Sequence, residues 1–296
     1  MRPAAILESF PVTMTGGLVL GLLTGGFPAF TKEISMAALA VAMTLSLTNV
    51  TLAQTRGRDH IRHAAWALVI NYGALTALIL AISMFFEDDI RNGWILMAAA
   101  PSAISVVPFT TILGGKTSKA LFSTAVNYMV ALVLMPVLTL ALIGSSVDVV
   151  SLIVYVLLLI VLPMVLSRAV MRMNIGKPLN TSMLNVSMAV LIFAVAGANR
   201  EAFQGELMVV AAISVGCILR TYGSGLLTEL ALRRARVPKD ERISYVLFAS
   251  YKNLGLTATL AIALFEPIVA VPATICIVFE VVYVISLVRF YPRSPD

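Results

Sequence analysis

The chain has 296 residues, of which 59% are hydrophobic and only 12% are charged. A soluble domain has roughly 45–50% apolar and about 25% charged residues, so this composition excludes a soluble globular protein and leaves no length for a separate soluble domain. A spanning helix takes about 20 mostly apolar residues, which predicts an all-α polytopic membrane protein. The net charge of +6 is then expected to reflect membrane orientation rather than nucleic-acid binding.

Ten apolar runs, each bounded by charge, Gly or Pro, predict ten transmembrane helices. In the first run, Gly17, Gly21 and Gly25 recur every four residues, which predicts a face that a neighbouring helix can approach closely. The expected spans are 12–30, 34–54, 64–86, 93–113, 120–143, 148–167, 181–199, 206–230, 243–265 and 267–288.

Polar side chains in the third and fifth spans are candidate site residues. Asn71 lies in the third span, and Ser123 and Asn127 lie in the fifth. Ser123 and Asn127 are four positions apart, so they share one helix face. Such groups often bond their own backbone, and their value as site residues depends on convergence with other polar groups.

The fourth span contains Pro101 and Pro108. Each proline removes a backbone donor and clashes with the preceding turn, so we expect a broken helix with Ser102, Ser105 and Thr110 as candidate binding groups. Irregular backbone persists in a bilayer only when it is buried in protein or lines a wet cavity. The alternative is a simple proline kink.

The ninth span carries Lys252, about ten residues from either end of its run. An ammonium at this depth costs roughly 3 kcal/mol or more, which indicates a substrate or ion site, with an internal ion pair as the alternative. Asn253 adds a second polar group, and Gly255 predicts a weak point in the helix.

Two further ionisable groups lie in neighbouring spans, Arg220 in the eighth and Glu280 in the tenth. The pairs Lys252–Glu280, Arg220–Glu280 and Arg220–Glu229 are equally compatible with the sequence. Intramembrane charges of this kind are expected to pair with one another, and the choice of partner stays open at this point.

Cysteine and histidine usage argues against a metal or redox centre. Cys217 and Cys276 lie in apolar runs without CxxC spacing, so we expect packing residues rather than a disulfide or a zinc site. His60 and His63 lie in a basic loop and are expected to be solvated. No HExxH, nucleophile elbow or phosphate loop is present, so neither an enzyme nor a bound metal or cofactor is expected.

The basic residues alternate between the two ends of the predicted spans. With a cytoplasmic N-terminus, the inside segments hold 16 of the 21 Lys and Arg residues, as the positive-inside rule requires. The inside residues are Arg2, Arg56, Arg58, Arg62, Lys116, Lys119, Arg168, Arg172, Lys177, Arg233, Arg234, Arg236, Lys239, Arg242, Arg289 and Arg293. We therefore expect a multi-pass protein of the plasma or inner membrane with both termini in the cytoplasm.

An internal division after the fifth span predicts two halves, residues 1–145 and 146–296. Because five is odd, the second half must be inserted upside down if the halves are repeats, which is the inverted-repeat plan of many secondary transporters. The spans with breakers are the fourth and the ninth, each the fourth in its half.

At these residues the chain resembles the bile acid:sodium symporter family, within the superfamily that also holds arsenite efflux carriers. The resemblance covers nearly the whole chain, beginning with residues 18–23, 27–28 and 42–48. The segment from Ala100-Pro101 is similar to the family's Ala-Pro-Gly-Gly-x-x-Ser-Asn break, and Asn253-x-Gly255-Leu256 is similar to its Gln-Asn-Ser-Gly-Leu segment.

The resemblance implies a panel of spans one, two, six and seven and a core of spans three to five and eight to ten. It also implies that spans four and nine are unwound where they cross, that two sodium ions hold them there, and that an organic anion, sterol-like or a small carboxylate, moves by alternating access. Asn71 fits the family's third-span glutamine, and Ser123 with Asn127 suit its fifth-span hydroxyls.

The chain departs from the family at the sodium ligands. Aligned without gaps, the family's Ser-Asn pair falls on Val106 and Val107, its ninth-span glutamate on Phe248 and its glutamine on Lys252. Apolar side chains cannot ligate a hard cation, so we expect Lys252 to stand in for sodium. The lysine would either cycle a proton or act as a fixed charge in a uniporter or exchanger.

Three other functions stay open. The chain could be a sodium-coupled symporter with a rearranged site, a channel, or a transport-inactive membrane sensor. A channel would need a continuous polar lining, whereas these polar groups cluster at one depth. Apart from the bilayer and a small organic anion, the sequence predicts no partner, and it does not indicate an oligomeric state.

Overall fold

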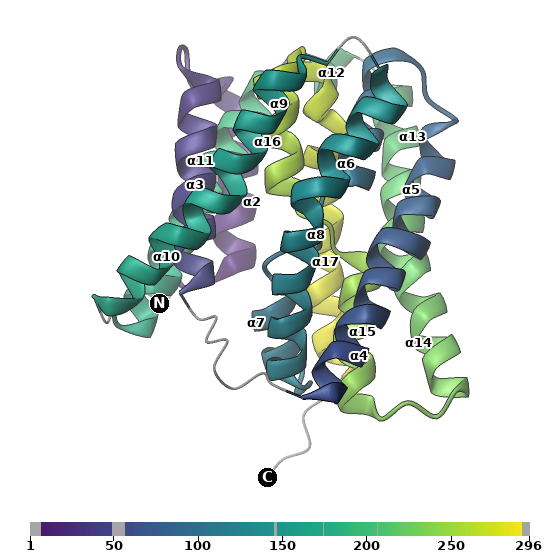
Figure 1. Ribbon diagram of the computed structural model, residues 1–296. Helices are drawn as coiled ribbons and strands as arrows, with labels where there is room; N and C mark the ends of the chain where they lie inside the picture. The colour runs from purple at the N-terminus through teal and green to yellow at the C-terminus, as the bar shows by residue number, and fades with distance from the viewer. Residues whose placement is uncertain (1–6, 49–56, 145–146, 174, 206, 292–296) are drawn as a thin grey trace.

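Apolar helices joined by short turns make up the structure, which is a computed structural model (Figure 1). It describes residues 7–48, 57–144, 147–173, 175–205 and 207–291. No strand occurs within these ranges, which confirms the predicted all-helical class. Arg2, Arg56 and Arg293, three of the residues placed on the inside, lie outside the described part.

Six helical rods in the described ranges are long and apolar enough to cross a membrane by length and composition. Three contain a π-helical segment of five or seven residues. The rods are Arg58–Ser83 (α4 Arg58–Leu68, η2 Val69–Leu75, α5 Thr76–Ser83), α8 Thr117–Ile143, Val149–Arg172 (α9 Val149–Val156, η4 Leu157–Val161, α10 Leu162–Arg172), α11 Lys177–Ala198, Leu207–Arg234 (α13 Leu207–Ile218, η5 Leu219–Gly223, α14 Ser224–Arg234) and Pro267–Phe290 (η6 Pro267–Ala270, α17 Val271–Phe290).

The first predicted span is shorter than expected and corresponds to α2 Phe10–Thr24. The second corresponds to α3 Thr31–Leu47, and residues 49–54 of that predicted span lie outside the described part. Gly25 ends α2 in the left-handed region, at φ 87°, a conformation that glycine adopts without a Cβ penalty. A short helix, α12 Arg200–Gly205, joins α11 to α13.

The fourth and ninth predicted spans are each divided into two helices. The fourth consists of α6 Asp88–Ala99 and α7 Val106–Ile112, and the ninth consists of α15 Lys239–Ser250 and α16 Leu254–Leu264. Six residues separate the first pair and three separate the second. The expected breaks are therefore present at both positions.

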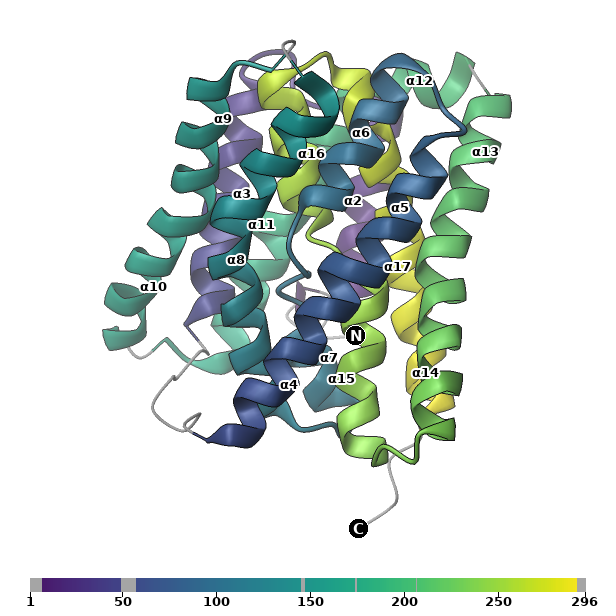
Figure 2. The same cartoon turned by 45° about the vertical axis from the view of Figure 1, so that its right-hand side comes forward.

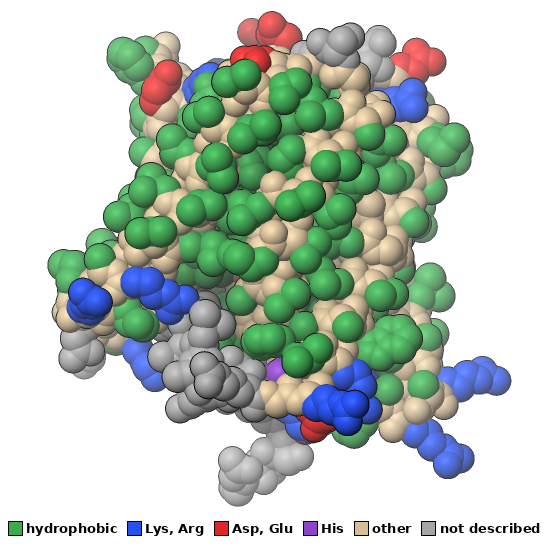
Figure 3. All heavy atoms as spheres, in the orientation of Figure 1, with side chains coloured by type: hydrophobic (Ala, Val, Ile, Leu, Met, Phe, Trp, Pro, Cys, Tyr) green, Lys and Arg blue, Asp and Glu red, His purple; other side chains and the backbone are tan. Residues whose placement is uncertain are grey.

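The helices form two groups (Figures 1 and 2). In the flanking group, which comprises α2, α3, α9 to α10 and α11, helix α11 packs along α2 and α3, and α10 packs on α3. The central group contains the remaining helices, including both broken ones. Hydrophobic side chains cover the middle of the visible face, most Lys and Arg gather at its lower end, and most acidic side chains lie at its upper end (Figure 3).

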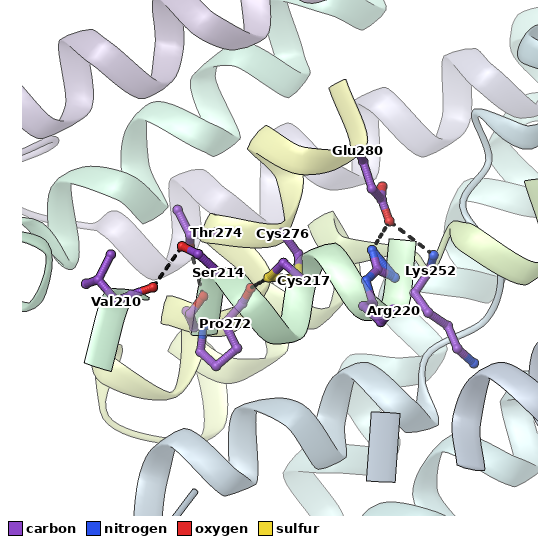
Figure 4. Close-up of a disulfide and its surroundings, with 10 residues drawn as sticks. Val210, Ser214, Cys217, Arg220, Lys252, Pro272, Thr274, Cys276 and Glu280 are labelled. Atoms are coloured by element: carbon purple, nitrogen blue, oxygen red, sulfur yellow. Dashed lines mark hydrogen bonds and ion pairs between the residues drawn. A yellow bond between two sulfur atoms is a disulfide. The ribbon is translucent and has the colours of Figure 1, made fainter. Parts of the chain in front are cut away.

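A disulfide joins Cys217 of α13 to Cys276 of α17 (Figure 4). The expectation of two unpaired packing residues was therefore wrong. The two cysteines are 59 positions apart in the sequence and lie on separate helices. Only the register of α13 against α17 brings them together, and no local spacing motif could have indicated it.

Close contact between α2 and α11 depends on Gly17, so Gly17→Val is expected to destabilise the protein by about 1–3 kcal/mol through overpacking. A Cβ atom at Gly17 would lie 2.5 Å from the backbone oxygen of Ala189, whereas one at Gly16 would meet nothing within 4 Å. Thermal denaturation in detergent measures the effect, with Gly16→Val as the matched control. Equal melting temperatures for the two variants would contradict this packing.

Candidate functional site

The two breaks cross at the middle of the central group and bond to each other through their backbones. Ser102 and Lys252 form an antiparallel bridge. The amide of Asn253 donates to the carbonyl of Pro101 at 2.8 Å, and the amide of Ala103 donates to the carbonyl of Tyr251 at 3.3 Å. The unwound backbone groups are thus satisfied within protein, as a bilayer requires.

Local sequence explains where each helix stops and restarts. Ala100 is extended, with ψ 151°, because the following proline disfavours the helical conformation. Tyr251 is likewise extended. Asn253 restarts the ninth span as an N-cap whose side chain accepts from the amide of Leu256, which is a strongly preferred capping role.

The ammonium of Lys252 lies at the carboxyl-terminal end of α6. Its Nζ atom donates to the carbonyls of Ala98 and Ala100 at 3.1 and 2.8 Å. It also contacts Asn71 Oδ1 at 3.1 Å and Thr76 Oγ1 at 3.0 Å. The carbonyl end of a helix carries partial negative charge and favours a cation.

The Lys252 side chain is fully buried, with 0% exposure, and its amine lies 4.5 Å from the centre of the Tyr72 ring. A ring face adds a cation–π contact to the four oxygen contacts. The alternative of an internal ion pair for Lys252 is not found among the described residues, since all four polar partners of this amine are neutral oxygens.

Asn71 and Asn253 connect the crossing to the helices around it. Asn71 Nδ2 donates to the carbonyl of Phe248 at 2.9 Å, at the end of α15, while its Oδ1 faces Lys252. Asn253 Nδ2 donates to the hydroxyl of Tyr128 on α8 at 2.7 Å. Both residues were predicted as site residues, and the structure brings both to the crossing.

Arg220 and Glu280 form a buried ion pair on the other side of the Lys252 backbone. Figure 4 shows the Glu280 carboxylate against Arg220, while the Lys252 side chain points away from it. The amide of Lys252 donates to Glu280 Oε1 at 3.4 Å. Glu229 binds Arg242 instead, with Nε to Oε1 at 3.1 Å, so Arg220–Glu280 is the pairing found among those left open.

Other predicted site residues lie away from Lys252. Ser123 bonds the ring of His63 at 2.8 Å, and Ser244 Oγ lies 2.8 Å from the other ring nitrogen. The expectation of a solvated His63 was therefore wrong, because this side chain is only 2% exposed. Asn127 donates to the carbonyl of Ser123, and Thr110 bonds the carbonyl of Val106 in its own helix.

Three residues that were predicted as helix breaks or binding groups lie beside the breaks, and their side chains make none of the contacts at the crossing. Ser105 is the N-cap residue of α7, without a side-chain cap bond. Pro108 lies in the first turn of α7, where amide groups lack helical partners in any case, so Pro101 rather than Pro108 begins the break. Gly255 lies in the first turn of α16, where a Cβ would come within 3.2 Å of Leu191.

Sequence reasoning missed several partners of the crossing. Thr76, Tyr72 and Tyr128 all contact it, yet nothing in their spacing distinguishes them from packing residues. The carbonyls of Ala98 and Ala100 leave no signature in side-chain identity. In the third span, the polar dipeptide Asn71-Tyr72 inside an apolar run was the available sequence signal that this helix contributes to the site.

Beyond the membrane segments, Glu241 lies at the start of α15 between Lys116 and Lys119, at 3.0 and 2.8 Å. Burial opposes ionisation of this carboxyl, but hydrogen bonds and charge from Lys119 and Lys116 outweigh it and lower the pKa of Glu241 to about 2. A carboxyl with a folded pKa below its unfolded value of about 4.3 stabilises the fold above that unfolded value.

Glu241→Gln is therefore expected to lower stability at pH 7 by about 1 kcal/mol and to have no effect near pH 2. The contribution of Glu241 is lost as the pH falls from about 5 toward 2. Melting temperatures at both pH values measure this difference. Asp240→Asn is the control, because the Asp240 side chain is 42% exposed. A pH-independent difference for Glu241→Gln would contradict the assignment.

A separate apolar groove of about 480 Å³ lies between α8 and the η4 to α10 segment. Its lining residues are Met129, Leu132, Val161, Met164, Val165 and Arg168. None of the predicted site residues contributes to this groove, so the crossing and not the groove is the candidate site.

The structure has two interrupted apolar helices, and their broken ends meet inside a bundle of membrane-length helices. This arrangement is typical of a class of membrane transporter in which the ends of half-helices form the site. The chain belongs to the SBF-like CPA transporter family, whose model matches residues 22–291. This membership confirms the resemblance to bile acid:sodium symporters and makes the chain a multi-pass membrane protein of a transporter family. No curated protein matches the chain.

Proposed function

We propose that this protein is a sodium-independent secondary active transporter that moves an organic anion by alternating access. The observation that carries the proposal is the buried ammonium of Lys252 among four oxygen acceptors at the crossing. A positive charge at the end of α6 is what a bound metal cation would supply there.

The residues around the crossing argue against sodium as the coupling ion. Val106 and Phe248 are completely buried, and Val107 is 9% exposed. All three occupy positions where the family resemblance implies oxygen or amide ligands, and their side chains offer no oxygen to a hard cation. The amine of Lys252 donates to the carbonyl oxygens of Ala98 and Ala100, so it occupies acceptors that a cation would otherwise use.

Of the two roles expected for Lys252, the contacts favour a fixed charge. An ammonium has three donors and no acceptor, so four surrounding oxygens suit the protonated amine. A neutral amine would leave some of these buried acceptors without a donor, which costs about 1–3 kcal/mol for each.

Ten spans in two inverted repeats are part of the proposal, and the crossing supports them. The bridged residues, 102 and 252, differ by 150 positions. Adding 150 to the number of Ala103 and subtracting 150 from that of Tyr251 gives Asn253 and Pro101, the two residues of the partner bond, as a two-fold axis through the bridge requires. The same offset relates Asn71-Tyr72-Gly73 to Thr221-Tyr222-Gly223, both in π-helical segments.

Alternating access would then occur between the flanking and central groups, which correspond to the panel and core of the resemblance. Where they meet, Met14 of α2 and Ile192 of α11 pack against Val281 of α17. These three side chains are apolar, so sliding at this point of contact breaks no polar contact between them. We place both termini in the cytoplasm, in line with the basic residues at one end.

The test is a thermal-shift screen of purified protein with organic anions from taurocholate to pyruvate, followed by counterflow in proteoliposomes with the anion that gives the largest shift. We expect equal uptake in sodium and in choline buffers. Uptake that strictly requires sodium would overturn sodium independence. Currents far above carrier turnover would favour a channel, and binding without flux would favour a sensor.

A further inference from the structure

The guanidinium of Arg220 is only partly used by the protein. Arg220 lies in the π-helical segment η5, and its side chain is completely buried. One amino group, Nη2, contacts one carboxylate oxygen of Glu280. Within the described residues, Nε and Nη1 of Arg220 have no hydrogen-bond partner, although they flank the engaged group on both sides.

Unpaired donors on a buried charge are costly. A guanidinium carries five N–H donors in a planar fork that matches carboxylates, and an unsatisfied donor on a charged group costs more than the 1–3 kcal/mol of a neutral one. The unpaired Nε and Nη1 atoms therefore indicate a binding site for an acceptor from outside the chain. The position of Arg220 in a π-helical segment agrees with this, because such segments are frequent at functional sites.

Glu280 is positioned to exchange a proton at the seam between the helix groups. Its side chain is 11% exposed, whereas that of Arg220 is 0% exposed. The next residue, Val281, packs against Met14 and Ile192 of the flanking group. If this seam opened, water would therefore reach the carboxyl of Glu280 before it reached the guanidinium of Arg220.

We propose that Arg220 binds the anionic group of the substrate and that Glu280 carries the coupling proton. In this exchange, a carboxylate or sulfonate replaces Glu280 on the guanidinium, and Glu280 takes up one proton. The charges balance. Before the exchange, the Arg220–Glu280 ion pair, the anion and the proton have zero net charge in sum. After it, the anion bound to Arg220 and the protonated, neutral Glu280 also have zero net charge. This assignment deepens the proposed function and rests on it.

The groups around Glu280 fit a single titrating site. Lys252 turns its ammonium to the opposite side and presents only its amide to the carboxylate. Tyr251 donates its hydroxyl to the backbone oxygen of Glu280 at 2.9 Å. On the flanking side, Met14 and Ile192 pack against the adjacent Val281. Among the described residues, the charged and titratable groups that interact with Glu280 are Arg220, Lys252 and Tyr251. Tyr283 packs against Tyr251, and Tyr222 packs against Tyr283.

The test measures proton uptake during anion binding. Full-length protein in detergent is titrated with pyruvate and with taurocholate, in buffers of different ionisation enthalpy and at several pH values. We expect the wild type to take up one proton per anion, so that the affinity falls about tenfold per pH unit as the pH rises. Glu280→Gln, which keeps the amide oxygen as acceptor for Arg220, should bind without proton uptake and without pH dependence.

Glu229→Gln is the matched control, because Glu229 is also a buried carboxylate paired with an arginine, the partly buried Arg242. The proton stoichiometry of this variant should equal that of the wild type. Arg220→Gln should lose anion binding. Binding by the wild type without proton uptake, or proton uptake retained in Glu280→Gln, would overturn this assignment alone. If neither anion bound the wild type, the proposed function would fail together with it.

Discussion

Lys252→Met is expected to reduce anion uptake at least about a hundredfold, equivalent to about 2.7 kcal/mol. Methionine has a similar length but neither charge nor donor. The substitution removes one donor from four oxygens at the crossing. The carbonyl of Ala98 keeps the hydroxyl of Thr76 as a donor, but Asn71 Oδ1 and the carbonyl of Ala100 lose the ammonium, and each buried acceptor left unpaired costs about 1–3 kcal/mol. It also removes the positive charge at the carboxyl end of α6. Counterflow in proteoliposomes measures the loss.

Lys32→Met is the matched control for this experiment. Lys32 also donates to a carbonyl near the end of a half-helix, that of Ala263 in α16, at 2.9 Å, and also faces a tyrosine ring, Tyr155. It lies away from the crossing, so its loss should leave uptake nearly unchanged. If Lys252→Met took up the anion as fast as the wild type, or if both variants lost uptake equally, a special role for the buried ammonium would be contradicted.

Removal of the disulfide is expected to lower the unfolding free energy by about 4 kcal/mol, on the chain-entropy account of a loop of this length. The bond closes a loop of 59 positions between α13 and α17. It lies near the Arg220–Glu280 pair, since Cys217 precedes Arg220 by three residues and Cys276 precedes Glu280 by four. The melting temperature should fall on the order of 10 °C.

The measurement compares wild type with and without a membrane-permeant reductant, alongside a double variant, Cys217→Ala and Cys276→Ala. Reductant should lower the melting temperature of the wild type to that of the double variant and should leave the double variant unchanged. Two thiols that react with a labelling reagent in unreduced, denatured wild type would contradict the pairing.

The all-helical class and both helix interruptions could be predicted from the sequence, because hydropathy and breakers act locally. Pro101 removes a backbone donor and disfavours the helical conformation of Ala100, although α8 continues through Pro136. The depth of Lys252 in an apolar run was also visible. Of its four acceptors, only Asn71 was predicted as a site residue, since two are backbone carbonyls and nothing in the sequence distinguishes Thr76 from a packing residue.

The errors share one physical cause. His63 looked solvated because the residues around it in the sequence are basic, but Ser123 and Ser244 come from other helices and satisfy both ring nitrogens. The pairing of Cys217 with Cys276 likewise depends on how two helices lie against each other. Partner choice between distant helices is a property of packing register, which one sequence does not reveal.

The antiparallel bridge between residues 102 and 252 makes chain length at the crossing critical. In extended backbone, successive side chains point to opposite faces, so inserting or deleting one residue beside the bridge would shift the pairing by one and reverse the direction of residue 252. The amine would then leave the end of α6 and turn toward Glu280, forming a salt link where the fold now keeps two charges apart. Proteins related to this chain should therefore differ in the side chains at the two breaks while the number of residues in each break stays constant.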